Sequence, residues 1–599
     1  FYLHISDSKV PFREGLTYKF VLPGQGFKRL VIPLDSFPST VNRSDISIMH
    51  FFCTTPRDMR LCLDNITLLK PGESVPDDVE PLLVEKIAAW KSVVLKESLK
   101  NLENIKKRYS PSDYEKDIVQ DVMGPFNYIE KNIRSKSENM DSIKSAQVLN
   151  DLDMLFSVFN NKINKIGNDL EFAVAYSKLD MPDNGIMVGF ASSMDKILPK
   201  DAAYKVKTSR KIEVSAARNE KESFQVVLKP LKSSLRNVVL TVSDLKGPSG
   251  QVLSSSNINS DVVGYVKTTN IPPNGTNYIG WWPDPILDWI GPVEVALGDL
   301  QSFWLRVRVP KGQQSGLYKG KITINADGIK PFSFGLSVKV RSFTLPDCTA
   351  LPTAITSIHT VNFDYVRDVL CGGADNWNRK MKYAYADFLA DYDIDMDNLY
   401  FNQPPDYDVV KYLHDKGQLT AFNLGFFGPD VADNHKFLDI AYTKAKELGV
   451  LDHAYIYGYD ECGPNTFPQL EAVTKDIKDS YPGVPVMTTS YDQSYGLDSV
   501  VKSMDAWCPL TPTYENNLDQ AKKARSNGKM VWWYICCGPG HPYANWFVES
   551  DAIEMRLLMG AMTAKYRPDG FLYYAMSFWN NNTPISKGPY TDWNPRSFG

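Results

Sequence analysis

The chain has 599 residues, of which 43% are hydrophobic and 23% charged, and its formal net charge is -4 at pH 7. This length exceeds what one hydrophobic core can organise, so we expect about three to five domains. The slight acidic excess argues against a nucleic-acid-binding protein, because no surplus of Lys and Arg is available to neutralise phosphates. No apolar run reaches about 18 residues, so we expect no membrane span.

The cysteines do not decide the redox compartment. The 8 Cys include no CxxC pair and fit no zinc spacing. Cys53 and Cys62 could pair if their strands are neighbours, and buried free thiols are an equally good interpretation. The chain begins at Phe1 inside a predicted strand, without an initiator Met or a signal peptide, so we interpret it as a processed or trimmed product.

The first 180 residues predict a small β domain and a helical spacer. Short strands are expected at 30–34, 46–52 and 61–68, and the last is similar to the closing strand of galactose-binding-like jelly rolls. Residues 1–75 therefore predict part of such a domain, with a sugar-binding or a structural accessory role. Apolar residues at helical spacing follow, and they predict a spacer of about three helices over 76–180. These stripes are Leu83, Ile87, Trp90 and Val94, and then Leu149, Leu152, Phe156, Phe159, Ile163 and Ile166.

Residues 181–347 return to the period of β-strands. Apolar side chains alternate in four segments, and turns such as 310–312 contain Gly and Pro, which predicts an antiparallel β-sandwich. The alternating segments are 224–228, 238–242, 303–309 and 332–340. The segment 280–285, with two Trp and two Pro, is expected to be a loop.

Residues 348–599 alternate between strands and helices, which predicts a (β/α)8 barrel. The expected strands are 353–358, 396–401, 420–426, 454–460, 485–490, 506–511, 530–536 and 570–578. The expected helices are 377–391, 406–416, 434–448, 465–480, 496–504, 516–527 and 550–567. The fold class is therefore multidomain, with a barrel preceded by a sandwich, a helical spacer and a partial jelly-roll-like domain.

The barrel prediction places one active face at the carboxyl ends of the strands. The fourth strand ends in two adjacent acids, Asp460 and Glu461, which in isolation could simply cap the next helix. Other polar and aromatic residues are expected at the same face, and carboxylates ringed by Trp and Tyr suit a sugar. They are His359, Asn402, Tyr491, Asp492, Tyr514, Glu515, Trp533, Tyr534, His541 and Trp579.

Core packing is the alternative for each of these aromatic residues. It is strongest for Trp532 or Trp533, because adjacent strand residues face opposite ways and one of them must point into the helix layer. No GxGxxG, P-loop or HExxH pattern occurs, so we expect no cofactor and no metal.

Several segments from about residue 183 onward point together to one family. They are 219–225, 280–285, 303–307, 316–320, 457–461, 533–534 with 537–539, and 570–574. In these segments the chain resembles glycoside hydrolase family 123, the β-N-acetylgalactosaminidases. The chain has additional residues before the sandwich, and we expect it to end earlier than other members do.

The resemblance implies a sandwich followed by a barrel and an enzyme that releases terminal β-linked N-acetylgalactosamine. It implies substrate assistance, in which Asp460 holds the 2-acetamido group and Glu461 is the acid/base. Tyr514, Tyr534, Trp533, Trp579, His359 and Asn402 are the candidate substrate-binding residues. The resemblance and a polymer-type substrate also imply a periplasmic or secreted location.

Geometry favours substrate assistance independently. A retaining glycosidase with a carboxylate nucleophile needs two carboxylates about 5–5.5 Å apart on opposite faces of the sugar. Neighbouring residues at one strand end approach from the same wall, with Cα atoms about 3.8 Å apart. Two alternatives stay open: a carboxylate nucleophile, Asp492 or Glu515, with Glu461 as acid, and a non-catalytic glycan-binding protein.

Overall fold

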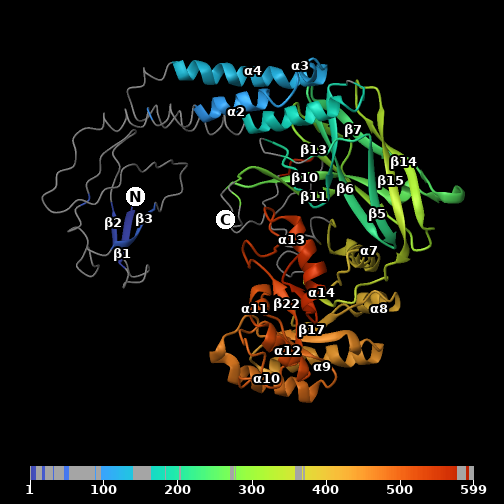
Figure 1. Ribbon diagram of the computed structural model, residues 1–599. Coiled ribbons are helices and arrows are strands. Elements are labelled where there is room, and N and C mark those ends of the chain that lie inside the picture. Colours follow the sequence, from blue (N-terminus) through green and yellow to red (C-terminus); the bar gives the residue numbers. More distant parts are fainter. Residues whose placement is uncertain are drawn as a thin grey trace. The chain divides into compact units, whose positions relative to one another are not determined.

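The computed structural model describes residues 2–7, 16–19, 32, 46–52, 88, 96–138, 163–182, 184–200, 204, 206–269, 276, 278–357, 367, 371–576 and 588–591. The chain divides into two compact units. One comprises Phe1–Pro111 and Met123–Gly167, and the other comprises Ser112–Val122 and Asn168–Gly599. Figure 1 labels many of the helices and strands of both units.

The N-terminal strands form a three-stranded antiparallel sheet in the order β2-β1-β3. Its members are β1 (Tyr2–Asp7), β2 (Leu16–Lys19) and β3 (Ile46–Phe52). The prediction of a strand over 46–52 is confirmed. The predicted strand 61–68, and 30–34 apart from residue 32, lie outside the described residues.

Three helices are described next in the chain: α2 (Lys96–Lys106), α3 (Pro111–Tyr114) and α4 (Asp117–Glu138). α2 buries Leu102 and Ile105, three residues apart on one face, as an amphipathic helix does. Residues 163–177 are also helical, and they contain the end of the second predicted apolar stripe. The four residues of the first stripe and the remainder of the second lie outside the described residues.

Two β-sheets follow in the second unit. The five-stranded sheet has the order β11-β10-β13-β6-β4, and the other has the order β12-β7-β14-β15-β5 with β8 and β9 attached. Phe190 of one sheet meets Phe334 of the other, with ring centroids 5.5 Å apart. The strands are β4 (Ile186–Ser192), β5 (Lys211–Arg218), β6 (Lys221–Pro230), β7 (Leu235–Val242), β8 (Leu245–Lys246), β9 (Val252–Leu253), β10 (Ile258–Lys267), β11 (Trp281–Leu287), β12 (Val293–Val295), β13 (Gln301–Arg308), β14 (Gly316–Asn325) and β15 (Phe332–Thr344).

Two details of this region differ from the prediction. β15 pairs with β5 in parallel, so the region is not purely antiparallel. The segment 280–285 was predicted to be a loop, but residues 281–287 form strand β11, which pairs with β10 at the edge of its sheet. An edge strand tolerates Pro283 and Pro285 because N–H groups on its outer side have no ladder partner to lose.

The C-terminal region contains parallel strands and intervening helices. One sheet has the order β17-β18-β19-β20-β21 and the other β16-β23-β22. A parallel bridge between Leu510 and Tyr534 connects the two sheets. The strands are β16 (Thr353–Ile355), β17 (Phe422–Phe427), β18 (Ala454–Gly458), β19 (Val486–Thr488), β20 (Ala506–Trp507), β21 (Met530–Val531), β22 (Trp533–Ile535) and β23 (Phe571–Tyr573).

The helices of this region lie between these strands in the sequence (Figure 1). They are α7 (Arg379–Ala390), α8 (Tyr407–Asp415), α9 (Val431–Leu448), α10 (Phe467–Ser480), α11 (Thr511–Asn516), α12 (Leu518–Ser526), α13 (Ala552–Leu557) and α14 (Thr563–Tyr566), with a π-helical turn at Leu558–Met562. None of the helices in the described part of the chain is long and apolar enough to cross a membrane.

Two predicted elements of this region are absent from the described structure. The segment 396–401 forms only one bridge, between Asp397 and Thr356, because the Asp397 carboxylate accepts the backbone N–H of Asn423 instead. The predicted helix 496–504 is irregular, with a turn at residue 496 and bends at 497–500. Its start is held by Asp492, whose carboxylate accepts the N–H groups of Ser494 and Gly496.

The buried side chains of the parallel strands separate into two clusters. The strand-only cluster contains side chains from the strands and their ends and none from a helix; it consists of Ala354, Leu399, Ala421, Tyr455, Tyr457, Met487, Ala506, Cys508, Trp532, Tyr534 and Leu572. The strand–helix cluster combines helix residues with those strand residues that point the other way. These strand residues include Ile456, Val486, Trp507 and Trp533. This division follows from the alternation of side chains along a strand.

Candidate functional site

The two adjacent acids lie in a turn directly after β18. Tyr459 and Glu461 both have left-handed backbone conformations, with φ of 48° and 52°. Such conformations cost a non-Gly residue about 1–3 kcal/mol and persist only where neighbouring groups hold them. The hydroxyls of Thr488 and Ser490 each donate to the carbonyl of Tyr459 at 2.9 Å. The turn is therefore fixed by the neighbouring strand β19 and the residues after it.

Asp460 is solvent-exposed and has two hydroxyl partners. The Tyr457 hydroxyl donates to its Oδ1 at 2.5 Å, and the Thr489 hydroxyl donates to the same atom at 2.7 Å. Both donors are buried, and burial followed by the charge of Asp460 raises the pKa of Tyr457 well above its usual value. Tyr457 therefore stays protonated and remains a donor to the carboxylate at neutral pH.

Glu461 is also exposed, and its partners come from other strands. The Tyr534 hydroxyl donates to its Oε1 at 2.5 Å. Burial, and then the hydrogen bond and charge of Glu461, raise the pKa of Tyr534. Burial, the charge of Glu461 and a hydrogen bond to it also raise the pKa of Tyr491 to about 12. The two carboxylates thus have separate sets of tyrosine partners.

Tyr400 lies near both carboxylates. Its ring centroid is 6.2 Å from that of Tyr457, and its pKa is raised by burial and then by the charges of Asp460 and Glu461. Within the described residues, no group of three or more His, Cys, Asp and Glu side chains is arranged to hold a metal ion. The site is therefore a pair of exposed carboxylates surrounded by tyrosine hydroxyls.

The structure brings one of the other predicted binding residues to the pair, Tyr534. Trp533 and Tyr514 belong to the strand–helix cluster, with ring centroids 5.3 Å apart, whereas Tyr534 belongs to the strand-only cluster. Tyr514 was expected at a strand end, but α11 already begins at Thr511. The Tyr514 hydroxyl there donates to the carbonyl of Tyr566 at 3.0 Å.

Of the remaining predicted binding residues, only Asn402 is among the described residues. Asn402 is exposed and follows Phe401, whose carbonyl accepts the N–H of Phe426. His359 and Trp579 lie outside the described residues.

Sequence reasoning did not identify Tyr457, Thr489 and Tyr400 as parts of the site. Tyr457 occupies the same side of β18 as Tyr455, three residues before Asp460, and strand alternation could have indicated it. Thr489 required the register of the neighbouring strand, in which Tyr457 is opposite Met487. That register cannot be obtained from one sequence.

The two carboxylates considered as alternative nucleophiles have other contacts. Asp492 is 7% exposed, and its oxygens accept hydrogen bonds from the N–H and hydroxyl of Ser494, the N–H of Gly496 and the hydroxyl of Ser499. Glu515 is exposed on α11 and accepts the hydroxyl of Tyr566 at 3.0 Å. Both carboxylates therefore have contacts typical of structural roles.

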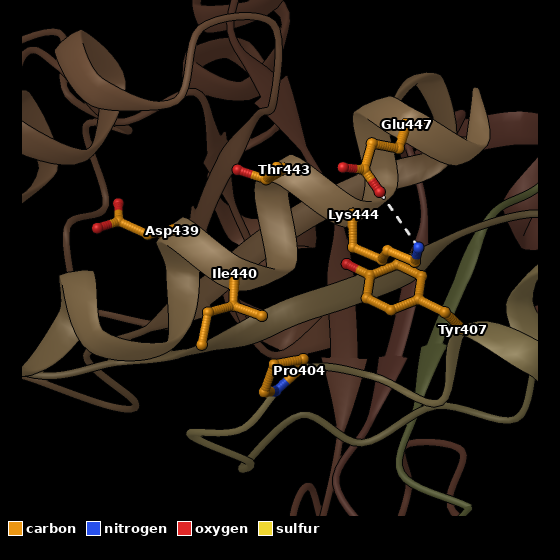
Figure 2. A pocket seen from close by; sticks show the side chains of 7 residues that line it. All are labelled: Pro404, Tyr407, Asp439, Ile440, Thr443, Lys444 and Glu447. Atoms are coloured by element: carbon orange, nitrogen blue, oxygen red, sulfur yellow. Dashed lines mark hydrogen bonds and ion pairs between the residues drawn. The ribbon is translucent and has the colours of Figure 1, made fainter.

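A cavity of about 450 Å³ lies elsewhere, between α9 and the start of α8. Figure 2 shows its lining residues, with the ion pair between Lys444 and Glu447 at one side. The lining residues are Pro404, Tyr407, Asp439, Ile440, Thr443, Lys444 and Glu447. None of them contributes to the carboxylate pair, so we take the β18 turn and not this cavity as the candidate site.

Two family models match the chain. The glycoside hydrolase 123 N-terminal domain matches residues 191–326, and the glycoside hydrolase 123 catalytic domain matches residues 387–597. Together they span more than half of the sequence, and the second contains both carboxylates. The chain belongs to glycoside hydrolase family 123. It is therefore a glycoside hydrolase, as the sequence predicted.

A solved family 123 glycoside hydrolase from Clostridium perfringens, described in terms of glycolipid glycan hydrolysis, is similar to this family 123 chain. The identity is 16%, the match covers 69% of this chain and 82% of that one, and the TM-score is 0.53, which supports a common fold. No curated protein sequence matches the chain.

Two further structures match with TM-scores too low to carry an argument. A Bacteroides ovatus xyloglucanase in complex with a heptasaccharide has 11% identity and a TM-score of 0.21, with 61% of this chain and 91% of that one covered. An FMN-binding β-glucuronidase from Facaelibacterium prausnitzii has 12% identity and a TM-score of 0.24, with 60% and 54% covered.

Proposed function

We propose that this family 123 enzyme releases terminal β-linked N-acetylgalactosamine with retention, through an oxazolinium intermediate formed by the substrate's own acetamido group. The observation that carries the proposal is the pair Asp460 and Glu461, adjacent in one turn yet held by different hydroxyls. Two carboxylates on one wall are poorly placed to straddle an anomeric carbon. They are well placed to act on two neighbouring groups of one sugar.

In the proposed reaction, Glu461 protonates the glycosidic oxygen as the acetamide oxygen attacks the anomeric carbon. Asp460 accepts the amide N–H, orients the acetamide and stabilises the positive charge of the oxazolinium. Glu461 then removes a proton from water, which attacks the anomeric carbon and restores the acetamide. Tyr534 stays bonded to Glu461 and keeps its carboxyl group in place.

A carboxylate nucleophile is the less favoured alternative. Asp492 would have to leave its hydrogen bonds to Ser494 and Gly496 to attack a sugar. Glu515 lies on α11, whose Tyr514 packs into the strand–helix cluster and not against the carboxylate pair.

We further propose that the two parallel sheets form one (β/α)8 barrel and that the two sheets before it form a β-sandwich. The barrel is supported by the parallel order of the strands, by the bridge between Leu510 and Tyr534, and by the separation of a strand-only cluster from a strand–helix cluster. It would place Asp460 and Glu461 at the carboxyl ends of its strands, where such enzymes act. We also propose a periplasmic or secreted location, which a polymer-type substrate requires.

Two variants test the proposed mechanism. Glu461→Gln should slow hydrolysis of substrates with poor leaving groups by roughly 10²–10⁴-fold and affect the first step on activated aryl substrates much less, because these need little protonation. Asp460→Asn should impair both kinds of substrate, because the acetamide must always be oriented. Steady-state kinetics with aryl and disaccharide N-acetylgalactosaminides measure both effects.

The competing mechanism is tested on the wild-type enzyme. A 2-fluoro galactoside traps carboxylate nucleophiles, and mass spectrometry locates the labelled residue. Labelling of Asp492 or Glu515, together with good turnover of the plain galactoside, would overturn the proposal. Strong inhibition by a thiazoline analogue of the intermediate would support it.

A further inference from the structure

Thr489 contacts both catalytic candidates at once. It is 2% exposed and follows β19, the strand that pairs with β18. Its hydroxyl donates to Asp460 Oδ1 at 2.7 Å and accepts the backbone N–H of Glu461 at 2.9 Å. One hydroxyl thus links the side chain of the first acid to the backbone of the second.

The number of protons available fixes the direction of these bonds. Thr489 and Tyr457 each have one hydroxyl proton. The backbone N–H of Glu461 is a donor only, so Thr489 accepts from it and has its own proton for Asp460. Tyr457 also donates its proton to Asp460 Oδ1. The hydroxyl oxygens of Tyr457 and Thr489 lie 3.1 Å apart, but neither donates to the other, because both protons point to the carboxylate.

This arrangement makes the two carboxylate oxygens of Asp460 unequal. Both of its hydroxyl donors bind Oδ1, and among the described residues no side-chain donor binds Oδ2. Rotation of the carboxylate would break two hydrogen bonds to a charged acceptor, which are stronger than hydrogen bonds between neutral groups. Oδ2 is consequently held in one direction and open to a ligand.

We propose that Thr489 is a positioning residue that fixes Asp460 so that Oδ2 receives the amide N–H of the substrate's acetamido group, while it holds the strained backbone of Glu461. The inference rests on the proposed function and extends it to a residue outside the acid pair. Its action is indirect, because Thr489 is buried behind Asp460 and need not touch the sugar. Its effect should therefore depend on the acetamido group.

The test compares Thr489→Val and Thr489→Ala with Thr489→Ser in the full chain. Val and Ala remove the hydroxyl, whereas Ser retains it. The matched control is Thr474→Val on α10, since Thr474 is fully buried and its hydroxyl has no hydrogen-bond partner within the described residues. The kinetic probes are an aryl N-acetylgalactosaminide and the corresponding plain galactoside, and the binding probe is a thiazoline analogue.

We expect kcat on the acetamido substrate to fall by about 10- to 100-fold in Thr489→Val and Thr489→Ala, with KM changed by no more than about 3-fold. Affinity for the thiazoline should fall by a similar factor, since it mimics the oriented acetamide. Thr489→Ser should restore both values to within about 3-fold of the wild type, and Thr474→Val should leave them unchanged. A role confined to stability would not produce this matched loss and rescue.

Three outcomes would overturn the inference. The first is a hydroxyl-free variant with kcat within about 2-fold of the wild type, and the second is a folded Ser variant as impaired as the Ala variant. In the third, kcat falls but thiazoline affinity does not. If the wild type instead hydrolyses the plain galactoside as well as the acetamido substrate, the proposed function itself fails, and the inference fails with it.

Discussion

Gly458 is the residue whose size matters most directly for the candidate site. An ideal Cβ at this position would lie 2.2 Å from the backbone oxygen of Phe427 on the neighbouring strand. Backbone cannot yield as a flexible side chain can, so Gly458→Ala must push β18 away from β17. We expect a loss of about 1–3 kcal/mol of unfolding free energy, typical of overpacking. Denaturant unfolding measures it.

Gly463 supplies the control within the same connection. An added Cβ there would meet no atom within 4 Å, and its φ of -94° is accessible to any residue. Gly463→Ala should therefore leave stability nearly unchanged. Equal unfolding midpoints for the two variants would show that the close approach of β17 and β18 does not restrict the size of the side chain at residue 458. Activity should fall only in Gly458→Ala, because the turn with the proposed catalytic residues Asp460 and Glu461 directly follows β18.

At this scale the sequence indicates the two candidate acids but not the residues that hold them. Asp460 and Glu461 follow an apolar strand, and such a strand end can be recognised without a structure. The roles of Tyr457 and Thr489 depend on which strand residues lie opposite one another. Tyr534 and Trp533 were both candidates, and only the inward or outward direction of the strand side chains separates them.

The helix at 163–177 is tied to strand β6 by a buried ion pair. Lys229 is 1% exposed, and its ammonium group donates to the Asp169 carboxylate, which also accepts the Tyr204 hydroxyl at 2.5 Å. Lys229→Met would leave the carboxylate buried without its counter-charge. We expect a loss of about 3–5 kcal/mol of unfolding free energy, seen as a lower denaturant midpoint.

The exposed pair of Lys211 and Glu213 on β5 serves for comparison. Its side chains are 66% and 62% exposed, with nitrogen and oxygen 2.8 Å apart. Lys211→Met should lower the denaturant midpoint far less than Lys229→Met, since water already solvates both charges. A similar loss for Lys211→Met and Lys229→Met would contradict the assignment of the effect to burial.

Two buried carboxyls before β17 predict how stability depends on pH. Burial raises the pKa of Asp395 to about 7 and that of Asp397 to about 6, despite hydrogen bonds that act in the opposite direction. The folded state then binds more protons than the unfolded state between about pH 4 and 7. Stability should therefore decrease as pH rises through this window, by up to about 1.4 kcal/mol per pH unit for each carboxyl.

Two variants test whether Asp395 and Asp397 cause this decrease of stability with pH. Asp395→Asn or Asp397→Asn removes one titrating group and should flatten the decrease of stability between about pH 4 and 7, which thermal unfolding measures. The Asn side chain retains an acceptor for the N–H of Thr420 or Asn423. An unchanged slope in both variants would assign the pH dependence to other groups.

Elements with strong periodicity were predicted well, and those held by side chains were not. Helices α8, α10 and α12 lie within the predicted ranges, and their apolar faces repeat at helical spacing. Strand β11 was missed because its prolines resemble a loop. The segment 496–504 is irregular and not the predicted helix, because the Asp492 carboxylate accepts backbone N–H groups at its start.

At the scale of the whole second unit, the two sheets of β4–β15 and the region that follows them in the chain meet at specific contacts. Asp391, after α7, pairs with Lys221 and Arg308 of the five-stranded sheet. The hydroxyl of Tyr590, near the end of the chain, donates to Asp299 at 3.0 Å. These partners are far apart in sequence, so periodicity could predict the two regions but not the interface that joins them.

Trp282 gives this interface a testable apolar centre. It is 5% exposed and belongs to a small buried cluster with Val266 of β10 and Val548 from the segment after β22. Trp282→Ala should remove about 3–5 kcal/mol, the usual cost of truncating a buried aromatic residue. Because the lost contacts join the two regions, we expect their unfolding transitions to separate in calorimetry. The 58% exposed Trp289 is the control, and Trp289→Ala should change stability by no more than about 0.5 kcal/mol. One undivided transition in Trp282→Ala, at the wild-type midpoint, would show that the polar contacts alone hold the two regions together.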